Sequence, residues 1–160
     1  MARFRSTITD RGSEVLTQLI ASGSQLQVVR AASGDGIPET SPNTLSALVS
    51  PVSVNTQVQA KEFIAGDPSI MKIPVQVTNA GLESSVWIRE VGIFALDADN
   101  VEFLFAYSWL DGEDSDNILP PSSFLGEIEE MADTVHIHDV AIFVTNQENS
   151  AVSVQVGASS

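Results

Sequence analysis

The run Val86–Phe94 constrains the fold most, because it combines the residues of a buried strand with two adjacent opposite charges, Arg89 and Glu90. Side chains alternate between the faces of a strand, so a continuous strand would place Glu90 on the same face as Ile88 and Arg89 on the other. Since an unpaired buried charge is costly, each charge is expected to have a partner elsewhere, and Arg89 is expected to contact a carboxylate or backbone carbonyls. Gly92 indicates a bulge or a close approach of other atoms.

The segments around this run predict one N-terminal helix and about six strands. Thr9 is a suitable N-cap and Gly23 a suitable stop for a helix over residues 10–22, whose apolar stripe would pack on a sheet. Strands are predicted near residues 25–30, 52–64, 70–78, 86–96, 101–109, 134–145 and 151–156. A second short helix is expected over residues 44–49, and Pro74 at a sheet edge or a bulge.

These elements favour a single α+β domain over residues 1–160, with the N-terminal helix packed on a largely antiparallel β-sheet or sandwich. The chain has no cysteine, which excludes disulfides and thiol chemistry. Its start lacks an apolar signal region, and no apolar run approaches the ~20 residues of a membrane-spanning helix. We therefore expect no membrane insertion.

Charge is distributed very unevenly along the chain. Residues 1–89 hold seven basic and seven acidic residues, and residues 90–160 hold the other fourteen acidic residues, hence the whole net charge of −14. Such a chain lacks the Lys and Arg contacts that nucleic acids need and is disfavoured at anionic membrane surfaces. The charge suits a solvated acidic surface, a basic protein partner or cation binding.

Two groups of residues could hold a metal. His136 and His138 would share one face of a strand, and three copies meeting on a threefold axis would supply six imidazoles for a transition metal. The acidic loop supplies oxygen ligands suited to Ca²⁺, although it lacks the glycine and the last glutamate of an EF-hand, and Asp97 and Asp99 form a smaller incomplete set. The acidic residues of the loop are Asp111, Glu113, Asp114 and Asp116.

Catalytic motifs are not found in the chain. With two histidines, no cysteine and no Gly-x-Ser-x-Gly, nucleophilic hydrolysis has little support. Gly34-Asp35-Gly36 lacks the glycine spacing and the lysine of a phosphate loop, so a tight turn is the expected structure. We expect no catalytic residue and no enzymatic activity.

Six short motifs occur in a fixed order and together resemble a known family. They are Thr9-Asp10-Arg11-Gly12, Gly34-Asp35-Gly36, Leu45-Ser46-Ala47-Leu48-Val49, Ile88–Phe94, Asp97-Ala98-Asp99-Asn100 and Ile118-Leu119-Pro120-Pro121. Their order and spacing, over roughly residues 1–155, resemble the phage tail-collar fibre family in the form found in prophages of Gram-positive bacteria. This family forms the N-terminal attachment domain of many tail fibres. The resemblance implies structural roles for Gly34, Asp35, Gly36, Arg89, Glu90, Gly92, Phe94, Pro120 and Pro121.

The resemblance implies a structural virion protein that anchors a tail fibre to the baseplate or tail tip and supports host attachment. The expected partners are other tail or baseplate proteins and two further copies in a homotrimer, with assembly in the host cytoplasm and final location in the virion tail. No shaft or tip follows Ser160, so the chain is expected to be an adaptor for a separate receptor-binding chain, a short fibre or a truncated one. The same part would serve an infectious phage or a tail-like bacteriocin.

A different class of function remains open. The chain could be a small carbohydrate-binding module that contacts the cell surface, with Ca²⁺ in the acidic loop over residues 111–116. An enzyme acting on surface glycans would instead need two carboxylates about 5–10 Å apart in a cleft.

Overall fold

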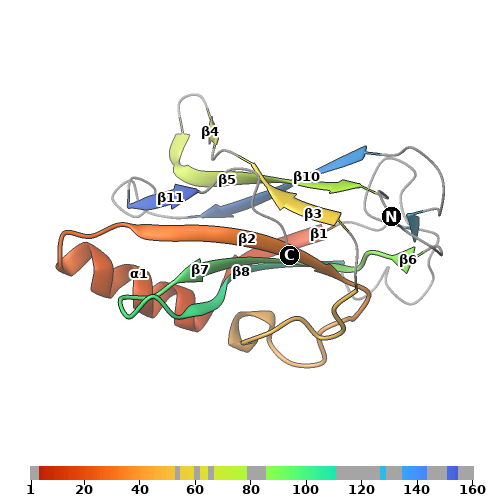
Figure 1. The fold of residues 1–160 in the computed structure, drawn as a ribbon, viewed down its shortest axis with the longest axis horizontal. Helices are drawn as coiled ribbons and strands as arrows, with labels where there is room; N and C mark the ends of the chain where they lie inside the picture. Colours follow the sequence, from red (N-terminus) through yellow and green to blue (C-terminus); the bar gives the residue numbers. More distant parts are fainter. Residues whose placement is uncertain are drawn as a thin grey trace.

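The computed structural model of this chain describes residues 4–52, 55–59, 62–64, 67–78, 86–110, 127–128, 135–143 and 151–154. Within these residues the chain is mostly β-sheet and has one α-helix, α1 (Asp10–Ala21), and one 3₁₀ turn, η1 (Pro42–Thr44) (Figure 1). The strands are β1 (Phe4–Ile8), β2 (Leu26–Gly34), β3 (Asn55–Val58), β4 (Glu62–Ile64), β5 (Asp67–Thr78), β6 (Val86–Trp87), β7 (Glu90–Leu96), β8 (Glu102–Leu110), β9 (Glu127–Ile128), β10 (Val135–Phe143) and β11 (Val152–Val154).

Two main sheets form the body of the protein. The larger has five strands in the order β1-β8-β7-β2-β11, and the smaller has the order β10-β5-β3 with β4 also paired to β5. A separate short pair joins β6 to β9. The described pairings are antiparallel except β11 with β2, which is parallel. The prediction of a largely antiparallel sheet is therefore confirmed.

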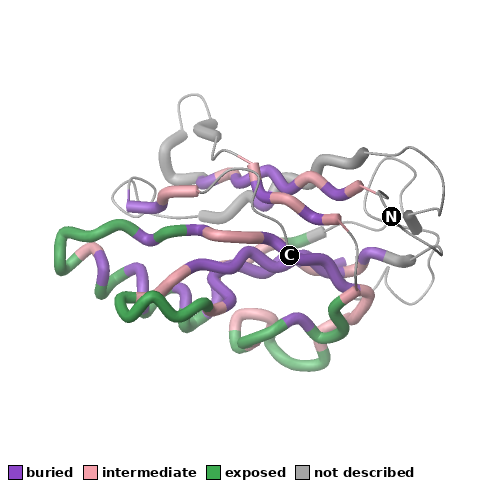
Figure 2. The backbone as a smooth tube through the Cα atoms, viewed as in Figure 1, coloured by how far each residue is buried: buried purple, intermediate pink, exposed green. Residues whose placement is uncertain are grey.

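An apolar core lies between the two sheets. Val91, Ile93 and Ala95 of β7 alternate toward it, and alternate residues of β5 belong to the same cluster, all fully buried. Figure 2 shows the facing strands as mostly buried. The hydroxyls of Ser33 (β2) and Thr56 (β3) form a buried hydrogen bond of 2.7 Å between the sheets. Because side chains alternate along a strand, the remaining side chains of β7 point away from this core, toward the outer face of the larger sheet.

That outer face carries a second, smaller apolar cluster. Its fully buried or nearly buried members are Ala32, Leu48, Phe94, Leu104 and Tyr107. Four of them come from strands of the larger sheet, and Leu48 comes from the loop that follows β2. At this outer cluster, the loop that follows β2 packs against the larger sheet.

The α+β prediction is confirmed only in its sheet. The helix predicted over residues 10–22 is present as α1, and Val15, Leu16 and Leu19 are its buried stripe. With a single 12-residue helix in the described part of the chain, the fold is mostly β rather than α+β. No helix in that part of the chain is long and apolar enough to cross a bilayer.

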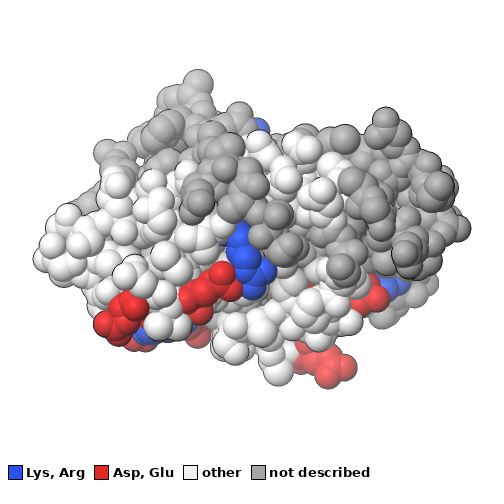
Figure 3. All heavy atoms as spheres, viewed as in Figure 1, with Lys and Arg blue, Asp and Glu red and all other residues white. Residues whose placement is uncertain are grey.

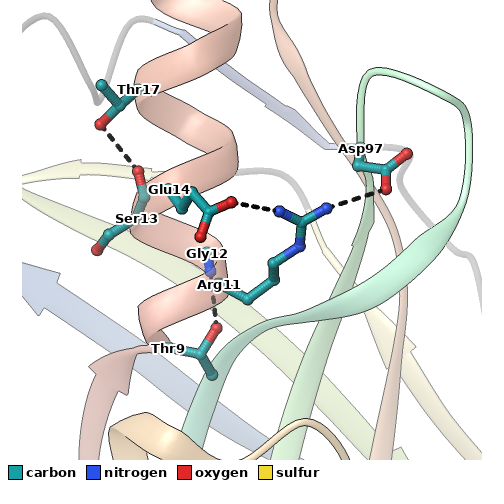
Figure 4. Close-up of polar contacts among 7 residues, drawn as sticks. All are labelled: Thr9, Arg11, Gly12, Ser13, Glu14, Thr17 and Asp97. Atoms are coloured by element: carbon teal, nitrogen blue, oxygen red, sulfur yellow. Dashed lines mark hydrogen bonds and ion pairs between the residues drawn. The ribbon is translucent and has the colours of Figure 1, made fainter.

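The start of α1 is attached to β8 by one buried threonine. The hydroxyl oxygen of Thr9 accepts a hydrogen bond from the amide of Gly12 at 2.9 Å, which caps the helix as predicted (Figure 4). The same hydroxyl donates to the carbonyl of Leu104 at 2.7 Å. The amide of Thr9 donates to the carbonyl of Phe105 at 2.9 Å. The helix cap and the attachment of the helix to the sheet therefore depend on the same residue.

Asp97 organises the turn between β7 and β8, which lies where the sequence predicts it. One carboxylate oxygen accepts the amides of Asp99 and Val101, each at 2.9 Å, and Asn100 adopts a left-handed φ of 61°. The other oxygen lies 3.4 Å from Arg11 of α1, which also pairs with Glu14 (Figure 4). The Val101 amide first, then the Asp99 amide and the Arg11 guanidinium, lower the pKa of the Asp97 carboxyl.

Opposite charges lie next to one another on the described surface. Arg11 pairs with Glu14 of α1 and with Asp97 of the turn. Arg30 pairs with Glu102 at 2.7 Å, and its guanidinium lies 4.0 Å from the centre of the Phe94 ring. Figure 3 shows blue and red atoms adjacent along this side of the molecule. These exposed pairs orient side chains and contribute little stability.

Pro74 lies within β5, which has β10 on one side and β3 and β4 on the other, so its predicted position at an edge or bulge is wrong. Its carbonyl accepts the amide of Gln59 at 2.8 Å, just past the pairing of Val58 with Val75. The N and O of a strand residue point to the same side. The missing N–H of Pro74 therefore falls beyond the end of the β3 ladder, where the strand tolerates it.

We expect Thr9→Ala to lower the free energy of unfolding by about 1–2 kcal/mol, because it removes both the helix cap and a buried hydrogen bond to β8. Thr9→Ser is the matched control, since serine keeps the hydroxyl and should retain most of the stability. Urea unfolding followed by circular dichroism measures both. Equal stability of Thr9→Ala and the parent chain would contradict this role of the hydroxyl.

Candidate functional site

The predicted strand over residues 86–96 is interrupted, and the interruption creates the site. β6 ends at Trp87 and β7 begins at Glu90. Between them, the amide of Arg89 donates to the carbonyl of Gly34 at 2.8 Å, and its carbonyl accepts the amide of Leu110 at 2.9 Å. Because the strand is broken here, Ile88 lies in the core between the sheets with Val91 and does not share the face of Glu90. The prediction of strict alternation through this run is wrong.

Glu90 is a fully buried carboxylate on the outer face of the larger sheet. Its Oε1 accepts the amide of Val49 at 2.8 Å and the hydroxyl of Tyr107 at 2.7 Å. Its Oε2 accepts the amide of Ser50 at 2.7 Å and the amide of Gly36 at 3.3 Å. Four donors from the same chain therefore surround one carboxylate, which is how a buried charge is accommodated without a cation.

The glycines near Glu90 are required by close contacts. A Cβ at Gly34 would overlap Oε2 of Glu90 and would lie 2.6 Å from the carbonyl oxygen of Ser50. A Cβ at Gly92 would lie 2.8 Å from Cδ2 of Leu48 and 2.9 Å from Cδ1 of Leu104. Leu48 occupies the space that Gly92 leaves open. The predicted close approach at Gly92 is confirmed, and a register shift follows one residue later, between Ile93 and Phe94.

Residues 35–50 form a surface loop, here called the strap, whose two ends meet at Glu90. The amide of Asp35 donates to the carbonyl of Ser50 at 2.9 Å, and Gly34 forms an isolated antiparallel bridge with Pro51. The helix predicted over residues 44–49 is wrong, because only η1 (Pro42–Thr44) is helical here. In a helix the amide of Val49 would bond within the segment, whereas here it bonds to Glu90.

Arg89 contacts a backbone carbonyl, as expected for this residue. Its Nη1 donates to the carbonyl oxygen of Asp35 at 3.3 Å, and its side chain is half-buried. Arg89 and Glu90 thus bind the same segment, Gly34-Asp35-Gly36, from neighbouring positions. Of these two charged side chains, Glu90 is the one that is fully buried. The tight turn predicted for this segment is absent, because Gly34 ends β2 and the chain continues through Asp35 and Gly36 without a turn.

Tyr107 is the residue of this site that the sequence did not identify. It is the only tyrosine in the chain, it is fully buried, and its ring stacks on Trp109 with the centroids 6.1 Å apart. Burial first, and then the hydrogen bond to Glu90 and the negative charge of that carboxylate, raise the pKa of the Tyr107 phenol. Its hydroxyl, in the largely apolar run Phe103–Leu110, was the available sign that a buried acceptor had to lie nearby.

The structure brings together seven of the residues to which the resemblance gives structural roles: Gly34, Asp35, Gly36, Arg89, Glu90, Gly92 and Phe94. Pro120 and Pro121 lie outside the described residues, as do the acidic residues of the calcium hypothesis over 111–116. His136 and His138 lie in β10 and pair with Val77 and Val75 of β5, so the backbone keeps the two-residue spacing of the metal hypothesis.

The described part of the chain contains no cluster of three or more histidine or acidic side chains that could hold a metal. Comparisons with protein-family models, with curated proteins and with solved structures found no match to this chain.

We expect Glu90→Ala to lower the free energy of unfolding by about 3 kcal/mol or more, because it leaves three backbone amides and a phenol without their acceptor. Urea unfolding followed by tryptophan fluorescence measures it. Glu102→Gln, at an exposed carboxylate paired with Arg30, is the control and should change stability by less than about 1 kcal/mol. Similar losses in the two variants would show that Glu90 has no special structural role.

The single tyrosine permits a direct alkaline titration. Since the folded pKa of Tyr107 is raised, its contribution to stability is present below the unfolded value of about 10 and is lost as the pH rises through the folded pKa. We therefore expect tyrosinate absorbance to appear only together with unfolding, well above pH 10. The chain in urea, titrating near the ordinary value, is the control. Reversible ionisation near pH 10 with the fold intact would contradict the buried hydrogen bond.

Proposed function

We propose that this protein is a structural component of a phage or phage-like tail, acting as the domain that attaches a fibre to the baseplate or tail tip. The observation that carries the proposal is the convergence of separate motifs on Glu90. The motifs Gly34-Asp35-Gly36, Leu45–Val49 and Ile88–Phe94, on which the resemblance to tail-collar fibre proteins rests, meet at this one carboxylate.

The chemistry of the site supports a scaffold rather than a catalyst. Both oxygens of Glu90 are occupied by donors of the same chain, and its side chain has no exposed surface. A general acid or base must reach a substrate proton, and a buried, fully hydrogen-bonded carboxylate does not. What the motifs preserve is the position of a loop on a sheet, which is the kind of feature an assembly domain needs.

Attachment would work through shape and rigid geometry. The protein would form a homotrimer that docks on other tail or baseplate proteins. Three copies, each at −14, would carry a charge of −42. Apolar contact area, salt screening or a basic surface on the tail partner would have to offset that repulsion.

Light scattering and electron microscopy together test this proposal. We expect a particle of three times the 17.0 kDa chain mass at moderate salt, with dissociation favoured at low ionic strength. Antibodies against the chain should label the end of the tail in particles purified from a strain that carries the gene. A chain that stays monomeric, labels no particle and binds a cell-surface glycan in a chelator-sensitive way would instead favour the carbohydrate-binding module.

A further inference from the structure

We propose that the strap, residues 35–50, is a latched element that opens as a unit while the two sheets stay folded, with Glu90 as its latch. This inference concerns the fold itself and stands independently of the proposed function. The strap leaves the sheet after Gly34 and returns to it at Pro51, where the two residues bridge. A loop whose ends meet in this way can move about its neck without displacing the strands that flank it.

Away from its neck, the strap contacts the body through Leu48 and through η1, which lies near β1, α1 and β8. Leu48 is its only buried side chain, Leu45 is partly buried, and Val49 is 45% exposed. Away from the neck, a side-chain hydrogen bond of 2.9 Å links Asn43 to Asp10 at an exposed position. Exposed polar contacts of this kind contribute little to stability. The apolar packing of the strap against the sheet therefore depends mainly on Leu48.

Most of the hydrogen bonds that attach the strap to the sheet converge on one side chain, the carboxylate of Glu90. Gly36 at its beginning and Val49 and Ser50 at its end all donate backbone amides to Glu90. Residues of the strap therefore share a single acceptor that belongs to the sheet. Loss of that acceptor would release both ends of the strap together, which is the behaviour of a latch rather than of independent contacts.

Opening of the strap would expose apolar surface in the outer cluster. Leu48 covers Gly92 and packs with Phe94, Leu104 and Tyr107. With Leu48 withdrawn, these strand residues would form an exposed apolar patch, while the core between the sheets, which contains Val91 and Ile93, would remain covered. The body can therefore stay folded when the strap opens.

Glutamine at position 90 keeps the shape of the side chain and replaces one acceptor oxygen with an NH₂ donor. If that NH₂ faces Tyr107, whose hydroxyl can rotate to accept, it also faces the amide of Val49. If it faces the other way, it meets the amides of Gly36 and Ser50. In either orientation at least one backbone amide of the strap faces a donor, so Glu90→Gln should weaken the latch with little change in packing.

Hydrogen exchange measured by mass spectrometry on the intact chain tests the proposal. In Glu90→Gln we expect amides of residues 36–50 to exchange about tenfold faster or more, and to remain much less protected than the amides of β5 and β8, which open only through global unfolding. Leu48→Ala should give the same pattern by removing the apolar plug, and Glu102→Gln should leave exchange of the strap unchanged. Strap amides that are as well protected as those of β5 and β8, or no acceleration in the strap, would overturn the proposal.

The parent chain supplies a test that needs no variant. In urea concentrations below the unfolding transition, the strap amides should exchange through an opening with a small dependence on urea, because little surface is exposed. The β5 and β8 amides should exchange through the global unfolding, with its full urea dependence. Identical urea dependence for the strap and for these strands would overturn the proposal even if Glu90→Gln fails to fold.

Discussion

The structure depends on how one negative charge is buried. A carboxylate removed from water has to receive hydrogen bonds from its surroundings, and Glu90 receives four, from three segments of the chain. That requirement brings Gly36, Val49 and Ser50 to the outer face of the sheet. It also accounts for the absence of the helix predicted over residues 44–49, since the amide of Val49 is bonded to Glu90.

The same requirement accounts for the residues around the carboxylate. Gly34 leaves room for the Glu90 side chain, and Gly92 leaves room for Leu48. Tyr107 supplies the fourth donor and joins the apolar cluster that the loop covers. Motifs that are far apart in the sequence are therefore parts of one structural unit. This is why we propose an assembly role, in which the position of a loop is the feature to be preserved.

The sequence predicted the local elements well where a residue has one dominant local role. The helix start was predicted from Thr9, and the turn from the run Asp97 to Asn100. The adjacent charges of Arg89 and Glu90 indicated that each side chain needs a partner elsewhere in the structure. It failed where a distant group decides the conformation. The helix predicted over residues 44–49 is absent because the amide of Val49 bonds to Glu90, and the break at Ile88 follows from backbone hydrogen bonds of Arg89 to Gly34 and Leu110.

Partners of a buried polar group are a tertiary property, so the pairing of Tyr107 with Glu90 could be suspected from the sequence but not assigned. The share of sheet was also underestimated, because β1 and the two-residue strand β9 are not among the predicted strands, whereas the periodic 12-residue helix is. The prediction for Pro74 failed for a related reason. Pro74 is tolerated inside β5 because it lies between the part of β5 that pairs with β3 and the part that pairs with β4, and these pairings are tertiary features.

A double-mutant cycle between Glu90→Ala and Tyr107→Phe tests the central claim most directly, because each change removes the hydrogen bond between the two side chains and the cycle measures that bond apart from the other effects of each change. The account predicts a coupling free energy of at least about 1 kcal/mol from urea unfolding of the parent, the two single variants and the double variant. Additive losses, within about 0.3 kcal/mol, would show that Glu90 and Tyr107 do not act together and would contradict the account.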